Sequence, residues 1–125
     1  MRVIIVDDND YIRSLLEYLL QQAHHEIVGQ AATGQQALEL CASAQPDLIT
    51  LDMSLPDMTG FEVLPKLHAN HPHLKILVIT GNNSEHLRDE IFELGATALI
   101  LKPFDLKSLR EAINSLSQEG EDASS

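Results

Sequence analysis

Acidic, hydroxyl and ammonium side chains stand at the ends of several short apolar runs in this sequence. Asp7 and Asp8 follow the first run, Asp52 the third, Thr80 the fourth and Lys102 the fifth. Carboxylate oxygens bind hard divalent cations, and a cation together with a lysine ammonium can neutralise the oxygens of a transferring phosphoryl group. Brought together, these residue types are suited to phosphoryl transfer, with one carboxylate as the nucleophile.

The apolar runs have the length and composition of buried strands, and longer segments with helical spacing separate them. The runs cover residues 3–6, 26–31, 48–51, 76–79 and 98–101. The first intervening segment has the apolar spacing of an amphipathic helix at Ile12, Leu15, Leu16, Leu19 and Leu20. Strict alternation of strand and helix predicts a parallel sheet with helices on both faces. We therefore expect a doubly wound, five-stranded, flavodoxin-like α/β fold with strand order 2-1-3-4-5.

Local signals place the ends of several helices. Asn9, Ser84 and Asp105 are suited to cap the start of a helix, because a short polar side chain can accept a bond from the first backbone amides. Thr33 has the spacing of a capping box with the glutamine three residues later. Gly95 is expected to end the fourth helix.

The predicted fold gathers the strand-end residues at one place. Ligands of open α/β sheets bind at the carboxyl ends of the strands, and strands 1, 3, 4 and 5 are neighbours in the expected order. Two carboxylates about 4 Å apart repel by roughly 4 kcal/mol, so three close pairs approach the roughly 5–15 kcal/mol that stabilises a domain. A hard divalent cation would relieve this repulsion, and oxygen ligands favour Mg²⁺ or Mn²⁺. Asp52, at the end of the central strand, is the expected phosphoryl acceptor.

Composition narrows the class of protein. The 125 residues suit one domain, which we place at 1–117, with the polar segment 118–125 as a disordered tail or the start of a linker. Eight Lys and Arg against 19 Asp and Glu give a formal charge of −11, which disfavours direct binding to nucleic acid or to anionic membranes. The single cysteine excludes an internal disulfide, and no apolar stretch approaches membrane-spanning length. These features predict a cytoplasmic protein.

Taken in order, the motifs resemble the receiver domain of two-component response regulators, of the chemotaxis-regulator type. The resemblance covers residues 2–116. Its matching stretches are Val6-Asp7-Asp8, residues 46–52, residues 55–60, Thr80-Gly81, Gly95-Ala96 and Lys102-Pro103-Phe104. It implies a phosphorylation switch in signal transduction rather than an enzyme acting on an external substrate.

The resemblance also implies a metal site and a phosphoryl donor. Asp52 would take the group from a phosphohistidine of a sensor histidine kinase or a phosphotransfer protein. Asp8 would ligate Mg²⁺ directly and Asp7 through water, while Asp52 and the backbone carbonyl of Ser54 would complete the protein ligands.

By the same resemblance, Lys102 would pair with the phosphoryl group and Thr80 would shift to bond it. The peptide bond from Lys102 to Pro103 is expected to be cis. An output domain or protein target would be controlled through the face formed by the fourth helix, the fifth strand and the fifth helix. Receivers often carry Tyr or Phe three residues before the lysine, whereas this chain has Leu99, so its readout departs from an aromatic switch.

Two alternatives use the same fold. A phosphohydrolase that forms an aspartyl-phosphate intermediate typically has a second acid two residues after the nucleophile, and here that residue is Ser54. A flavin-binding module needs a Ser/Thr-rich phosphate loop after the first strand. Residues 7–10 read Asp-Asp-Asn-Asp instead, which would repel a phosphate.

Overall fold

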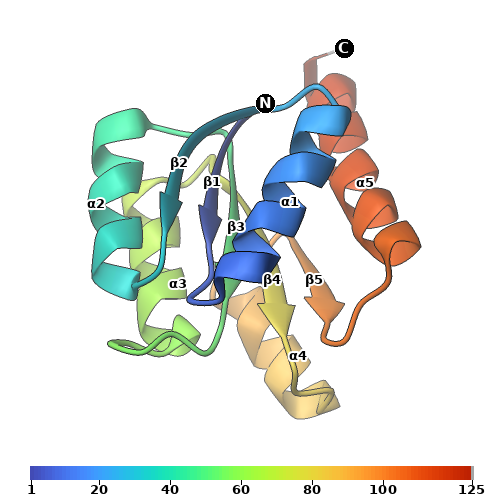
Figure 1. Ribbon diagram of the computed structural model, residues 1–125. Coiled ribbons are helices and arrows are strands. Elements are labelled where there is room, and N and C mark those ends of the chain that lie inside the picture. The colour runs from blue at the N-terminus through green and yellow to red at the C-terminus, as the bar shows by residue number, and fades with distance from the viewer. Residues whose placement is uncertain (125) are drawn as a thin grey trace.

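The computed structural model describes the backbone of residues 1–124 and the side chains of residues 1–116. Strands and helices alternate along this part of the chain (Figure 1). The strands are β1 (Arg2–Val6), β2 (Glu26–Ala31), β3 (Leu48–Asp52), β4 (Lys75–Thr80) and β5 (Ala98–Leu101). The helices are α1 (Asp10–Gln22), α2 (Gly34–Ala44), α3 (Gly60–Asn70), α4 (Glu85–Glu93) and α5 (Leu106–Ser124).

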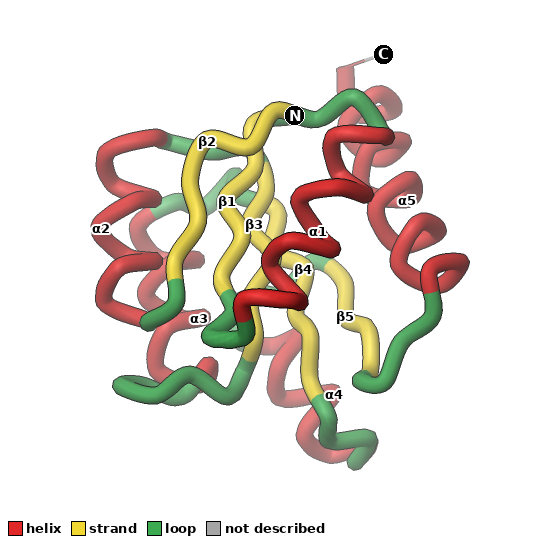
Figure 2. Tube along the Cα trace, in the orientation of Figure 1, coloured by secondary structure: helices red, strands yellow, loops and turns green. Residues whose placement is uncertain are grey.

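The strands form one parallel sheet in the order β2-β1-β3-β4-β5, which confirms the predicted doubly wound, flavodoxin-like fold. Helices α1 and α5 cover one face, and α2, α3 and α4 cover the other (Figure 1, Figure 2). Successive side chains of a strand point to opposite faces. In β1, Val3 and Ile5 therefore pack with the core on the α1 side, and Ile4 and Val6 with the core on the α2 side.

The middle of the sheet is buried on both faces. Every residue of β3 is buried, and so are the last four of β1. A strand without an exposed face needs no polar alternation, which explains why these segments are unbroken apolar runs in the sequence. The buried polar or charged side chains among the described residues are Asp7, Thr50, Asp52 and Thr80. Three of these four lie at the carboxyl ends of strands, where a ligand site is expected.

Most of the predicted helix caps are present. The side chain of Asn9 accepts a bond from Ile12 N at 3.1 Å, Thr33 Oγ1 accepts one from Gln36 N at 3.1 Å, and Asp105 Oδ1 accepts one from Ser108 N at 2.7 Å.

Ser84 occupies the cap position of α4, but its hydroxyl makes no bond to the helix, so the predicted cap bond was wrong. The turn before α4 is ordered differently, because Asn82 Oδ1 accepts the bond from Ser84 N at 2.9 Å.

The backbone of α5 continues to Ser124, beyond the end of the domain predicted at residue 117. The side chains of 117–124 and the whole of residue 125 lie outside the described residues, so the interpretation of 118–125 as a tail or linker stays a prediction. Over the part of the chain that the structure describes, no helix is both long and apolar enough to cross a membrane.

Candidate functional site

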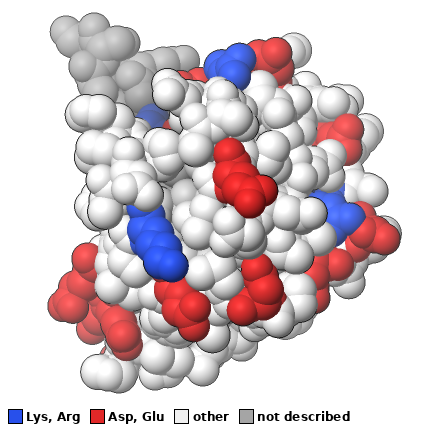
Figure 3. Space-filling view, turned by 90° about the vertical axis from the view of Figure 1, so that its left-hand side faces the viewer, with Lys and Arg blue, Asp and Glu red and all other residues white. Residues whose placement is uncertain are grey.

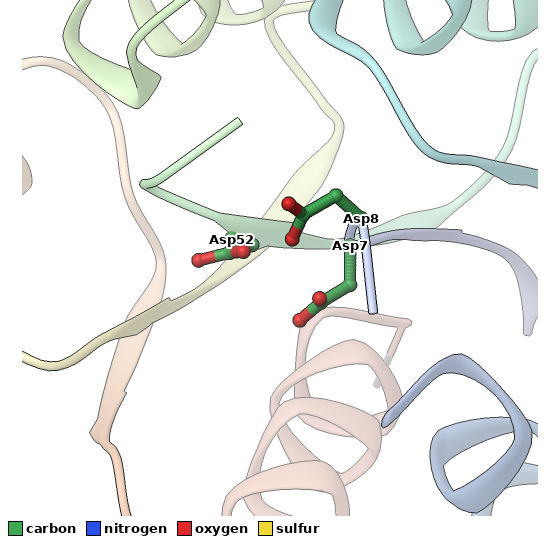
Figure 4. Close-up of side chains that lie close together, drawn as sticks. All are labelled: Asp7, Asp8 and Asp52. Carbon is green, nitrogen blue, oxygen red and sulfur yellow. The ribbon is translucent and has the colours of Figure 1, made fainter. Parts of the chain in front are cut away.

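The acidic side chains at the ends of β1 and β3 meet at one point. Val6 pairs with Leu51 in register, so Asp7, directly after β1, and Asp52, the last residue of β3, lie at the same level of the sheet. Asp7, Asp8 and Asp52 each offer a carboxylate oxygen, and these oxygens lie within 4.8 Å of one another. Figure 4 shows the three side chains directed toward a shared space. Asp7 and Asp52 are buried and Asp8 is exposed, so the cluster is reached from solvent on the Asp8 side.

Lys102 brings a positive charge into this cluster from the end of β5. Its Nζ lies 3.3 Å from Asp7 Oδ2 and 3.5 Å from Asp52 Oδ1. The backbone holds this arrangement, because Lys102 N donates to the carbonyl oxygen of Thr80 at 2.7 Å and so continues the pairing of β4 with β5. One ammonium against three carboxylates leaves the site with excess negative charge. The peptide bond from Lys102 to Pro103 is cis, as predicted.

The surroundings of Asp52 act on its ionisation. Burial raises the pKa of this carboxyl above its ordinary value. The backbone amide of Ser54, which donates to Asp52 Oδ1 at 3.2 Å, lowers the pKa, the charge of Asp7 raises it, and Lys102 lowers it again. The net effect is a raised pKa, with burial as its largest cause.

Thr80 and Ser54 lie on turns beside the cluster. Thr80 is buried at the end of β4, and its Oγ1 accepts a bond from Asn82 N at 3.2 Å, so the hydroxyl is engaged within its own turn. Ser54 has an exposed side chain and contacts the cluster through its backbone amide. The structure thus groups the four charged residues directly and places Thr80 and Ser54 at the border.

Arg13 is a further member of the site that the sequence interpretation missed. Its Nη1 donates to the backbone carbonyl of Asp7 at 2.5 Å, and its other terminal nitrogen pairs with Asp10. Asp7 is held from a second side as well, because Asn9 N donates to Asp7 Oδ1 at 2.9 Å. The signal in the sequence was a basic residue one turn into the helix that follows the acidic pair.

The donor set fits a hard divalent cation. It consists of carboxylate oxygens only, with no thiolate or imidazole in the group, which suits Mg²⁺ or a similar ion rather than a soft metal. The solvent-accessible side at Asp8 leaves room for water ligands, which Mg²⁺ usually retains.

The chain thus combines a doubly wound parallel sheet with an acidic, lysine-bearing centre at the carboxyl edge of that sheet. The sequence model of the response regulator receiver domain matches residues 3–114. The chain therefore belongs to the response regulator receiver domain family. Receiver domains are signalling switches, as the resemblance in the motifs implied.

Known proteins resemble this chain over nearly its whole length. Chemotaxis protein CheY of Thermotoga maritima is 32% identical over 117 residues, or 94% of this chain and 98% of that protein. Sporulation initiation phosphotransferase F of Bacillus subtilis is 34% identical over 112 residues, or 90% of each chain. A solved CheY-like receiver domain protein of Methanospirillum hungatei has a TM-score of 0.86 at 31% identity, covering 97% of both chains. The likeness thus concerns a complete domain and not an isolated motif.

Proposed function

We propose that Asp52 accepts a phosphoryl group from a phosphohistidine of a sensor histidine kinase or of a phosphotransfer protein. The observation that carries the proposal is the setting of this carboxylate: it is buried at the end of the central strand, 3.5 Å from the ammonium of Lys102 and clustered with Asp7 and Asp8. In the transfer, a carboxylate oxygen of Asp52 attacks phosphorus, the bond from phosphorus to the imidazole nitrogen breaks, and the imidazole leaves with that electron pair.

Mg²⁺, or Mn²⁺ in its place, is the proposed cofactor. Asp7, Asp8 and Asp52 are its proposed carboxylate ligands, and the backbone carbonyl of Ser54 is the proposed fourth protein ligand. When bound, the ion supplies positive charge that offsets the carboxylates and the phosphoryl oxygens. The excess of three carboxylates over one lysine in the cluster supports this assignment.

Lys102 and Thr80 are proposed to detect the modification. The Lys102 ammonium, already beside two carboxylates, would pair with a phosphoryl oxygen. Thr80 would exchange its present bond to the Asn82 amide for one to the phosphoryl group, which would move the turn before α4. Phosphorylation would then shift the populations of two conformations of the domain.

The proposed output surface is the face of α4, β5 and α5, acting on an output domain or a separate protein target. Leu99 of β5 is half-buried and packs against the core on the α4 side. Because this residue is a leucine, the chain has no aromatic ring that could change position here. A hollow of about 360 Å³, lined in part by Leu99, Phe104 and Arg88, lies beside it. We propose a cytoplasmic role without direct binding to nucleic acid or membrane, in keeping with the formal charge of −11.

The proposed switch catalyses its own phosphoryl transfer and slow dephosphorylation. The alternative, a phosphohydrolase with an aspartyl-phosphate intermediate, needs an acid where the chain has Ser54, whose side chain is exposed. Multiple-turnover release of phosphate from ordinary phosphomonoesters would favour that alternative.

The test uses acetyl phosphate, a small phosphoryl donor, with Mg²⁺. The wild-type chain should take up an acid-labile phosphoryl group, and Asp52→Asn should abolish the uptake, because an amide oxygen does not form the acyl phosphate. Intact-protein mass spectrometry measures the added mass. Asp89→Asn changes an exposed acid of α4 outside the cluster and should label like the wild type. Persistent labelling of Asp52→Asn would move the acceptor elsewhere.

A further inference from the structure

The loop between β3 and α3 is attached at its tip to the start of another helix. Asp57, in this loop, accepts bonds from the two first backbone amides of α2: Gly34 N donates to Oδ1 at 2.7 Å, and Gln35 N donates to Oδ2 at 3.0 Å. The two partners are 23 and 22 residues away in sequence. The loop therefore carries a two-oxygen contact to an element that it neither precedes nor follows directly.

The contact completes the N-terminus of α2. The first amides of a helix have no partner within it. Gln36 N is served by the local cap, Thr33 Oγ1, whereas Gly34 N and Gln35 N depend on Asp57. The pKa of Asp57 is lowered, and the hydrogen bonds from the Gly34 and Gln35 amides are the largest causes. The carboxylate therefore stays charged beside the positive end of the helix dipole.

The same loop is closed at its base, next to the acceptor. Ser54 and Thr59 form an antiparallel bridge, and Gly60 N donates to the carbonyl oxygen of Met53 at 3.0 Å. Met53 is packed so tightly on Gly60 that a Cβ there would lie 2.1 Å from Met53 Sδ. Ser54, one partner of this bridge, also donates a hydrogen bond from its backbone amide to Asp52 Oδ1. A displacement of the loop base would therefore displace a backbone group that bonds the acceptor carboxylate.

A close approach of helix and loop makes the attachment possible. A Cβ at Gly34 would lie 2.8 Å from Met58 Sδ and 2.9 Å from Val63 Cγ2. A side chain at this position would require Met58 of the loop or Val63 of α3 to shift, so the glycine lets the start of α2 approach closely and brings its amides within reach of Asp57.

We propose that Asp57 is a positioning residue for the phosphoryl site: by holding the tip of the loop to α2, it fixes the backbone of Ser54 against Asp52. This inference rests on the proposed function. If Asp57 were only a helix cap, its loss would affect only the stability of α2. If it is a tether, meaning a contact that holds the loop to α2, its loss would also affect phosphorylation at Asp52. Experiment can separate the two roles.

The experiment compares Asp57→Ala with Thr33→Ala, its matched control. Both variants remove capping bonds from the same helix end, but only Asp57→Ala releases the loop. The readouts are the initial rate of labelling by acetyl phosphate, the affinity for Mg²⁺ by calorimetric titration, and the stability to urea. We expect Asp57→Ala to label roughly tenfold more slowly or worse, because small misplacements near reacting groups have effects of this size. Its Mg²⁺ affinity should also fall, while Thr33→Ala keeps the rate and the affinity of the wild type.

Two further variants keep the test decisive if Asp57→Ala does not fold. Asp57→Asn retains one acceptor oxygen and should label at an intermediate rate. Gly34→Ala should push the loop from the helix side and slow labelling in the same way, although it leaves Asp57 unchanged. Wild-type rates and affinities in Asp57→Asn and Gly34→Ala, or equal stability losses without any change at the site, would reduce Asp57 to a helix cap. If the wild type takes no label on Asp52, the proposed function fails, and the Mg²⁺ titration still tests the tether.

Discussion

Asp52 is the residue on which burial and charge act most directly. It stands at the end of a strand that is buried along its whole length, and one lysine serves both it and Asp7. The pKa of Asp52 is raised, and burial is the largest cause, because the charged form of a carboxyl is less stable away from water. Shifted pKa values of this kind cluster at functional sites of proteins.

The raised pKa of Asp52 predicts a pH dependence of stability in the metal-free protein. The folded state binds this proton more tightly than the unfolded state, so the contribution of Asp52 to stability is greatest below its ordinary pKa of 3.8 and is lost as the pH rises through the raised pKa. Asp52→Asn stays neutral and should lack this fall. In urea unfolding with a chelator, we expect the variant to be the more stable protein at pH 7, by about 1.4 kcal/mol for each pH unit that separates the two pKa values.

The advantage of Asp52→Asn should disappear below pH 3.8, where the wild-type carboxyl is protonated in both states. Parallel pH profiles for the two proteins would contradict the assignment of the raised pKa to Asp52.

At the scale of elements, the ends of the helices are set by two kinds of contact. Asn9, Thr33 and Asp105 bond to amides three residues later, which is a local matter. Gly95 ends α4 with a φ of +122°, and its lack of a side chain also makes room for the His68 ring on α3. A turn that is strained for other residues is thus combined with close packing between two helices.

Gly95→Ala should destabilise the protein for both reasons. The backbone strain contributes about 1–3 kcal/mol. The added Cβ would also lie 2.5 Å from His68 Cγ. We expect a loss of roughly 2 kcal/mol or more in the free energy of unfolding, measured by urea denaturation. Adding His68→Ala removes the ring contacts but leaves His68 Cβ, which would lie 2.6 Å from the added Cβ. The double variant should therefore recover only part of the loss, and full recovery would show that the backbone at Gly95 is unstrained.

At the scale of the whole molecule, acidity is the dominant property. The formal charge is −11, and Figure 3 shows more acidic than basic side chains on the face that carries α2 and α3. Most of these charges are exposed and spread, so solvent and salt screen them. The cluster of Asp7, Asp8 and Asp52 differs because two of its members are buried, and a bound cation should act on it strongly.

Mg²⁺ should therefore stabilise the folded chain against heat. A ligand that binds only the folded state at about 100 times its Kd adds roughly 2.7 kcal/mol to the free energy of unfolding. Asp8→Ala should remove most of the rise in Tm, and because Asp8 is exposed the substitution leaves the core intact. Asp89→Ala, which changes an exposed acid on α4, should keep the rise. Differential scanning calorimetry at constant ionic strength makes the comparison, and an equal effect of Na⁺ would mean screening rather than binding.

The sequence by itself determined the elements, the order of the strands and the positions of Asp7, Asp52, Thr80 and Lys102 at strand ends. Apolar runs and helical spacing are properties of neighbouring residues, and the alternation of strand and helix restricts the sheet to few topologies. Local capping was predicted correctly where the bond lies within one turn. Ser84 takes the predicted cap position of α4, but its hydroxyl makes no cap bond, and its own amide donates to Asn82 Oδ1 instead.

Only the tertiary structure decided how close these groups come and which of them are paired. The carboxylates of Asp7, Asp8 and Asp52 meet within 4.8 Å, and Lys102 reaches Asp7 across 95 residues of sequence. The attachment of Asp57 to α2 and the fit of Gly95 against α3 depend likewise on the packing of whole elements. Distances of this kind follow from how helices and sheet settle on one another, and no spacing within a single segment encodes them.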